Sequence, residues 1–297
     1  MNERVSITQA LSPRRRAYDI VMRTLLYASA AIICALLIFL IGYILYRGIP
    51  SLSWEFLTSE ESVINDVQGI LPALINTLYI IIATLIFILP LGVGSAIYLT
   101  EYATNKKLVS AIEFATETLS GMPSIIFALV GVIVFCESLG LGKTLIAGAF
   151  SLVMMTLPTI IRTTQESLKT VPQSYREGSL ALGSGKWHMI RTVVLPSSVD
   201  GIVTGCILAI GRIVGESAIL MFTAGMSMFM QNYGSSVTEF FKNLFDSSGA
   251  TLTVALYVYA KERADFDQAF AVAVVLLVIA FIINISAKLA GRKLKKH

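Results

Sequence analysis

Charged side chains are scarce in this chain of 297 residues, where Asp, Glu, Lys and Arg make up only 14% of the sequence. An ordinary soluble domain carries about 25%. Hydrophobic residues fill the difference and reach 55%. So few charges argue against a soluble globular domain and indicate a chain that lies largely in a membrane.

Residues that carry metal or catalytic chemistry are also few. The three cysteines, Cys34, Cys136 and Cys206, each lie inside or at the end of an apolar run, and none has a Cys or His at metal-ligand spacing. We interpret them as small apolar packing residues. The apolar runs contain no His cluster, no paired carboxylates and no nucleophile beside a base. We therefore expect no metal, no cofactor and no catalytic site in this chain.

A Gly-Lys-Thr occurs at Gly142, Lys143 and Thr144, but it does not complete a phosphate-binding loop. That loop needs a further glycine five residues before the second one, and Glu137 stands there. The segment also joins two apolar runs rather than a strand and a helix. We expect ATP hydrolysis, if the function needs it, to come from another chain.

Long apolar runs dominate what is present. A helix of roughly 20 apolar residues spans a bilayer. The first run begins too late and is too long to be a cleavable signal, and Pro158 leaves the inner end of the fourth run uncertain. The sequence predicts an all-α polytopic membrane protein with six transmembrane helices, at about 22–46, 71–100, 114–136, 144–163, 199–223 and 267–288.

The basic residues are distributed unevenly between the two sides of these runs. With the N-terminus inside, the inner segments carry 17 of the 23 Lys and Arg, the outer segments carry five, and Arg212 lies within a run. This bias predicts that both termini and the 164–198 loop are cytoplasmic. Membrane lipid headgroups account for the basic clusters, so we do not expect nucleic acid as a partner.

Four regions follow from this pattern. We expect a cytoplasmic leader, a first transmembrane helix with an outer loop, a core of five spans, and a basic cytoplasmic tail. They cover residues 1–20, 21–70, 71–290 and 291–297, respectively.

The loop between the fourth and fifth runs contains the segment EGSLALGSGKWHMIRTVVLP at 177–196. Pro172 suits the first position of a helix over 173–182, and Gly183 can end it in the left-handed conformation. Ser184 can cap a second helix, which Pro196 would stop before the next span. The sequence therefore predicts two short helices with an exposed turn between them.

This loop resembles the conserved cytoplasmic loop of ABC-importer permeases, whose pattern is Glu-Ala-Ala-x3-Gly-x9-Ile-x-Leu-Pro. Gly178 and Ser179 stand where that family has alanines, and Val193 replaces the isoleucine. In that family the loop is a coupling helix that fits a cleft on an ATPase subunit. The resemblance implies a permease that moves solute without hydrolysing ATP itself. The matching positions are Glu177, Gly183, Leu195 and Pro196.

Two charges lie in the fifth apolar run, at Arg212 and Glu216. A charge facing lipid there is costly, so both should face protein or water. Their i, i+4 spacing lets them pair on one helix face, and Gly211 and Gly215 permit a close helix contact. Two interpretations stay open: a neutralised pair that locks two helices, or a pair on the solute pathway. A guanidinium suits a tetrahedral oxyanion because its N–H donors are forked.

The stretches LPTIIRTTQESLKTVP at 157–172 and LAIGRIVGESAILMFTAG at 208–225 resemble phosphate-import permeases of ABC transporters, over roughly 70–290. The resemblance places Arg212, Glu216 and, less directly, Arg162 on the translocation pathway. Phosphate permeases commonly have Glu three residues after the last of these, where this chain has Gln165 and then Glu166. Whether Arg162 pairs with a carboxylate or is simply a basic residue at the membrane edge stays open.

The resemblance also implies partners: a second permease, an ATPase dimer and an extracytoplasmic phosphate-binding protein, with inorganic phosphate as solute and the bacterial cytoplasmic membrane as location. An ABC permease for sulfate, molybdate, phosphonate or an amino acid is an alternative. A stand-alone secondary transporter is another, although the inverted repeats typical of that class are not evident.

Overall fold

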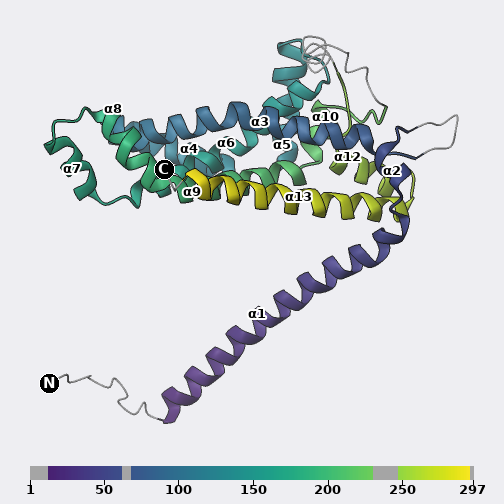
Figure 1. Ribbon diagram of the computed structural model, residues 1–297, viewed down its shortest axis with the longest axis horizontal. Coiled ribbons are helices and arrows are strands. Elements are labelled where there is room, and N and C mark those ends of the chain that lie inside the picture. The colour runs from purple at the N-terminus through teal and green to yellow at the C-terminus, as the bar shows by residue number, and fades with distance from the viewer. Residues whose placement is uncertain (1–12, 62–67, 230–246, 295–297) are drawn as a thin grey trace.

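The computed structural model describes residues 13–61, 68–229 and 247–294, and every regular element within these ranges is a helix (Figure 1). Residues 1–12 of the expected leader and 295–297 of the basic tail lie outside the described residues. The predicted all-α class is confirmed. The core is a bundle in which α3 packs along α6, α6 along α9, and α9 along α13. These helices are Leu71–Ile97, Leu145–Lys169, Leu195–Gly215 and Phe266–Leu294.

In the described part of the chain, five helical stretches are long and apolar enough to cross a membrane, and a bent pair makes a sixth if counted as one span. Four predicted spans correspond to α1 (Pro13–Gly48), α3, α6 and α13. Pro158 does not end the fourth span, because α6 continues to Lys169. The buried neighbours Met155 and Ile160 hold the helix on both sides of the proline, whose missing N–H removes one backbone hydrogen bond.

The third predicted span is not one straight helix. Helix α4 (Lys106–Ser120) and the stretch made of α5 (Ser124–Gly131) and the π-helical turn η3 (Val132–Ser138) meet at 102°. Pro123 causes the break, because proline disfavours a helical conformation at the preceding residue, Met122. Helix α4 has no buried residue, so the apolar run at 114–136 crosses two elements with different surroundings.

The fifth predicted span, 199–223, is displaced towards the N-terminus. Residues from Lys186 to Gly215 form one helical stretch, made of α8 (Lys186–Met189), the π-helical turn η4 (Ile190–Val194) and α9. The expectation that Pro196 ends the second loop helix is therefore wrong. The Leu195 N–H bonds to the Ile190 carbonyl, and this wider turn leads directly into Pro196 in the first turn of α9. The stretch ends at Gly215 with Glu216 as its C-cap, and α10 (Ala218–Thr223) is a separate helix.

Helix α1 leaves the bundle diagonally and approaches it only at its C-terminal end (Figure 1). There, the Tyr43 ring lies edge-on to Phe270 of α13, with centroids 5.6 Å apart, and Arg47 pairs with Asp267 at 3.3 Å. None of its apolar window is buried within this chain. Its apolar surface is thus left for lipid or for another chain.

Short helices close the two ends of the bundle. One end carries α7 (Gln173–Ala181), α8 and the π-helical turn η2 (Tyr98–Tyr102) that continues α3. The other end carries α10 and the remaining elements (Figure 1). These are η1 (Ile49–Ser51), α2 (Trp54–Thr58), α12 (Leu252–Tyr257) and η5 (Val258–Glu262).

Glycines set the distance between α6 and α9. A Cβ built at Gly205 would overlap the Thr163 side chain, and one built at Gly201 would overlap Ser167. The two glycines are four residues apart and share one face of α9. The sequence predicted such a small-residue contact at Gly211 and Gly215 instead. There, apart from the helix's own backbone and the chain neighbours, no heavy atom of the described residues lies within 4 Å of a built Cβ.

We expect Gly205→Leu to destabilise the purified chain by about 1–3 kcal/mol, because overpacking must move α9 away from α6. The thermal unfolding midpoint in detergent measures this loss. Gly211→Leu on the same helix is the matched control, and its midpoint should stay near that of the wild type. Equal losses in both variants would show that Gly205 does not set the helix distance.

Candidate functional site

The turn after α7 forms as predicted. Gly183 has φ +83°, a conformation that glycine reaches without the cost that a side chain would add. Its N–H bonds to the Leu180 carbonyl at 2.9 Å, so the helix closes there. Pro172 lies just before α7 rather than in its first position.

Ser184 does not cap the second helix. Its hydroxyl donates to the Ser179 carbonyl at 2.7 Å and lies 2.7 Å from the Ser179 hydroxyl. The N-cap of α8 is Gly185, which makes no side-chain cap. The serine pair therefore ties the turn back to α7, and residues 179–184 form a compact tip.

This tip is exposed. Glu177 and Gly178 face away from the bundle, and nothing lies within 4 Å of a Cβ built at Gly178 or Gly183. Large apolar side chains accompany them: Leu182 is 91% exposed and Trp187 is 57% exposed. An apolar and acidic tip at one end of the bundle is a surface suited to another protein.

The far end of the loop is fixed to the bundle instead. Leu195 is half-buried and packs against an apolar cluster, while Pro196 is exposed in the first turn of α9. Of the predicted loop residues, the structure thus groups Glu177, Gly178, Ser179 and Gly183 at the tip and separates the last two from them. The buried members of the apolar cluster are Ala96, Ile97, Leu168, Val171, Met189, Ile190 and Val194.

The base of α7 holds a buried ion pair that no pattern in the sequence predicts. Arg176 reaches one Glu101 oxygen through Nε at 3.1 Å and through Nη2 at 2.9 Å. The same guanidinium donates to the Leu168 carbonyl at 2.9 Å and to the Val171 carbonyl at 2.5 Å. The two charged side chains are 11% and 6% exposed. No spacing rule relates positions 101 and 176, so only the packing of η2 against the loop reveals the pair.

Arg212 is half-buried on α9, and its Nη1 lies 3.5 Å from the Thr159 hydroxyl on α6. Within the described residues it forms no ion pair with Glu216. The expected pairing requires a continuous helix, but α9 ends at Gly215 and Glu216 is extended, with φ −84° and ψ 122°. Arg212 and Glu216 therefore have separate hydrogen-bond partners.

Glu216 serves the helix break rather than Arg212. Its carboxylate accepts a hydrogen bond from the Ile219 N–H at 3.2 Å, at the start of α10. Its backbone carbonyl accepts from the Thr253 hydroxyl at 2.9 Å. Glu216 thus joins α9, α10 and α12 at one point.

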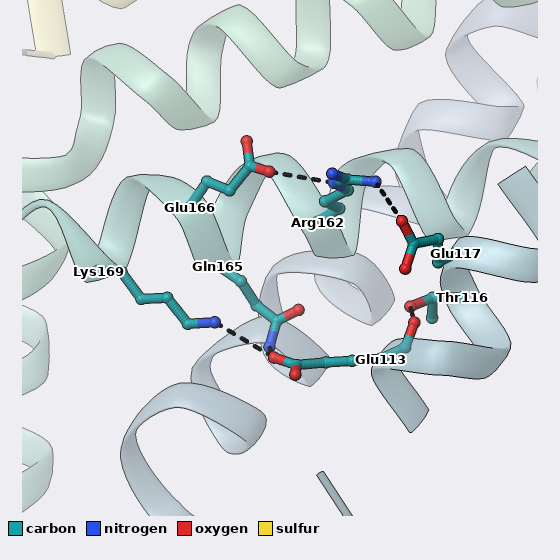
Figure 2. Close-up of a pocket in the computed structure, with 7 residues that line it drawn as sticks. All are labelled: Glu113, Thr116, Glu117, Arg162, Gln165, Glu166 and Lys169. Carbon is teal, nitrogen blue, oxygen red and sulfur yellow. Dashed lines mark hydrogen bonds and ion pairs between the residues drawn. The ribbon is translucent and has the colours of Figure 1, made fainter. Parts of the chain in front are cut away.

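Arg162 lies in a cavity of about 210 Å³ between α4 and α6 (Figure 2). Its Nε is 3.1 Å from Glu166 and its Nη1 is 3.7 Å from Glu117. Arg162 therefore does pair with carboxylates, and Glu166 takes the role that Gln165 cannot fill. The lining residues are Glu113, Thr116, Glu117, Arg162, Gln165, Glu166 and Lys169.

A second set of polar contacts lines the rest of this cavity. Glu113 accepts from the Gln165 amide and from Lys169, both at 3.2 Å (Figure 2). Gln165 is buried, whereas the Lys169 and Glu113 side chains are 58% and 40% exposed, so the ion pair between them contributes little to stability. Arg162 lies three residues after Thr159 on α6, which is one helical turn. The Thr159 hydroxyl that Arg212 contacts is therefore one turn of α6 away from Arg162.

We expect Glu216→Ala to lower the stability of the purified chain by about 1 kcal/mol, because the free N–H at the start of α10 loses its acceptor. Glu216→Gln keeps an acceptor oxygen and should unfold close to the wild-type temperature in detergent. If both variants lose equal stability, the charge itself would be what matters, and a pairing with Arg212 would have to be reconsidered.

Comparison with known proteins gives the same architecture. The family model described as "Binding-protein-dependent transport system inner membrane component" matches residues 88–296. The "Probable ABC transporter permease protein YqgI" of Bacillus subtilis strain 168 is 41% identical over 204 residues, which are 69% of each chain.

Two relatives match over almost their whole length. The "Phosphate transport system permease protein PstA 1" of Mycobacterium tuberculosis is 30% identical over 292 residues, covering 95% of this chain and 91% of the relative. The PstA protein of Haemophilus influenzae is 31% identical over 282 residues, covering 93% and 94%. The predicted resemblance is confirmed.

Solved structures share the fold at low sequence identity. A chain of a bacterial alginate ABC transporter in complex with its periplasmic protein superposes with a TM-score of 0.67 at 16% identity, covering 94% of this chain and 98% of that one. A chain of the MetNI methionine ABC transporter gives 0.58 at 20%, covering 76% and 94%. At these identities the likeness concerns the fold alone.

Proposed function

Because the chain belongs to the family of binding-protein-dependent transport system inner membrane components, we propose that it is the permease subunit that carries inorganic phosphate in a bacterial ABC importer. Membership makes it a multi-pass membrane permease that works with a binding protein and a separate ATPase. The phosphate assignment is the proposal. Full-length similarity to two phosphate permeases supports it.

Arg212 is the observation that carries the substrate assignment. It is a half-buried cation on a membrane helix, and its one side-chain hydrogen bond among the described residues is a long one, to a hydroxyl. A guanidinium that keeps free N–H donors in such a site can take two oxygens of a tetrahedral oxyanion. We assign Arg212 as the residue that contacts phosphate on the pathway.

Arg162 and Glu216 have different roles in this proposal. Arg162 is already engaged by two carboxylates, and the three acidic and two basic residues of its cavity leave it one negative charge in excess. It therefore shapes the pathway beside Arg212 rather than holding the anion. Glu216 anchors the break between α9 and α10, which fixes where the helix that carries Arg212 ends.

The exposed tip of α7 is proposed to dock on the ATPase. Glu177 offers a charge, Gly178 and Ser179 allow close approach, and Leu182 offers an apolar contact. ATP binding would draw two such loops together, one from this chain and one from a second permease. The permease pair would then accept phosphate from the extracytoplasmic binding protein and reopen inward after hydrolysis, as two global states biased by nucleotide and binding protein. The α7 end is cytoplasmic in this proposal, as are both termini.

We expect Gly183→Pro to uncouple ATP hydrolysis from uptake without preventing membrane insertion. Proline is fixed near φ −65° and cannot adopt the +83° of this turn, so the tip must refold. Gly185→Pro is the matched control, because Gly185 has φ −71° and open space around it. Phosphate uptake and ATP hydrolysis are measured on the same vesicles, and the ratio of phosphate taken up to ATP hydrolysed should fall in Gly183→Pro only. Normal transport by Gly183→Pro would refute the docking assignment.

We expect Arg212→Ala to reduce phosphate uptake by at least about tenfold, the effect of losing roughly 1.4 kcal/mol of interaction. The measurement is radiolabelled phosphate uptake at limiting phosphate, in cells with this chain deleted and then restored as wild type or variant. Arg191→Ala, an exposed arginine on η4, is the control.

Assembly of the Arg212→Ala complex must be intact, since loss of the complex would favour a purely structural arginine. Uptake that is unchanged when the chain is deleted would reassign the solute, and sulfate, molybdate and phosphonate would be tested next. Uptake that persists without any ATPase would support a stand-alone transporter.

A further inference from the structure

The geometry points to the Arg176–Glu101 pair as the joint that passes movement of α7 to the membrane helices. The inference rests on the proposed role of α7 as the element that docks on the ATPase. It goes beyond that role, because it assigns two positioning residues that lie behind the docking surface and do not contact the partner.

The loop is attached to the bundle at two places of different kind. At its far end, Met189, Ile190 and Val194 pack into the apolar cluster with the ends of α3 and α6. Helix α7 itself has no buried apolar residue, so it gains little from apolar packing. Arg176 is what fixes its orientation, through hydrogen bonds to the Glu101 carboxylate and to two backbone carbonyls.

The three acceptors lie on two parts of the bundle. Glu101 lies in η2, which continues α3, whereas the Leu168 carbonyl lies in the last turn of α6 and the Val171 carbonyl lies just after that helix. One planar guanidinium donates to both carbonyls and to the carboxylate, so α7 cannot tilt without breaking several charge-assisted bonds.

The burial of this pair distinguishes it from the others. Among the ion pairs of the described residues, each of the rest has at least one partner that is a third or more exposed. A buried pair adds little net stability, but removal of one partner leaves a charge that is costly to keep there. Such a pair specifies one geometry, which a contact between apolar side chains would not do.

The joint is bonded to α6, the helix that also contacts Arg212. Along α6, Leu168 is nine residues from Thr159, or about 14 Å at 1.5 Å per residue. Thr159 is the contact of Arg212. A displacement of α7 is therefore delivered to α6 within three turns of the proposed anion site, and to α3 on the other side of the joint.

The test compares amide hydrogen exchange in the assembled transporter with and without a non-hydrolysable ATP analogue. In the wild type, we expect the analogue to change exchange in α7 and also in residues 160–169 of α6, by about tenfold in each. In Glu101→Gln, the change should persist in α7 and disappear from 160–169. Asp19→Asn, which breaks the exposed pair with Arg23 on α1, is the matched control and should behave as the wild type.

An unchanged response of 160–169 in Glu101→Gln would overturn the inference, because the pair would then be an anchor only. If Glu101→Gln does not assemble, Arg176→Lys is read in the same way, since it keeps the charge but loses the fork. A wild type in which α7 itself ignores the analogue would refute both the docking role and the joint. A wild type that responds fully but takes up no phosphate would refute the substrate assignment alone.

Discussion

The packing of α6 between α3 and α9 is the contact on which the rest of this structure depends. Helix α6 is the most buried of the apolar spans, with 72% of its window inside the chain. Glycines on α9 let the backbones approach closely, and Gly92 on α3 does the same against Ile160. In a bilayer, where apolar side chains gain little by leaving lipid for protein, such close backbone contact is the main source of helix association. Arg162 lies on α6, Arg212 contacts it through Thr159, and Arg176 is bonded to its last turn.

Three arginines on or beside this helix have three different surroundings, and these surroundings separate their roles. Arg162 is exposed and shared by two carboxylates, Arg176 is buried and donates four hydrogen bonds, and Arg212 is half-buried with one long bond to a hydroxyl. The residue type alone would make them equivalent. The free donors of Arg212 suit a passing anion, whereas the four hydrogen bonds of Arg176 suit a fixed joint.

The coupling loop combines a bare tip with a rigid base. Its tip presents two glycines with open space around them in the described part of the chain, together with the exposed Glu177 and Leu182, while its base is held by the Arg176–Glu101 pair and the apolar cluster. An exposed tip is accessible to a partner surface. A stiff base ensures that movement of the tip is not lost within the loop before it reaches α3 and α6.

The sequence by itself determined the all-α class, four of the six expected spans and the turn at Gly183, because each of these depends on local properties. Apolar runs longer than a bilayer is thick define spans, and a glycine at 183 permits a left-handed turn whatever surrounds it. Pro123 also marks the break of the third span locally, although the long apolar run around it conceals the signal.

Only the tertiary structure decided which charges meet. Arg212 and Glu216 are separated because α9 ends at Gly215. The Glu216 carbonyl then accepts a hydrogen bond from the Thr253 hydroxyl, which lies in a distant segment of the chain. Arg176 and Glu101 are 75 residues apart in sequence and are joined by the way α3 and α6 end side by side. Hydrophobic periodicity and turn residues are local properties of the sequence. The partner of a buried charge depends instead on which distant segments pack together.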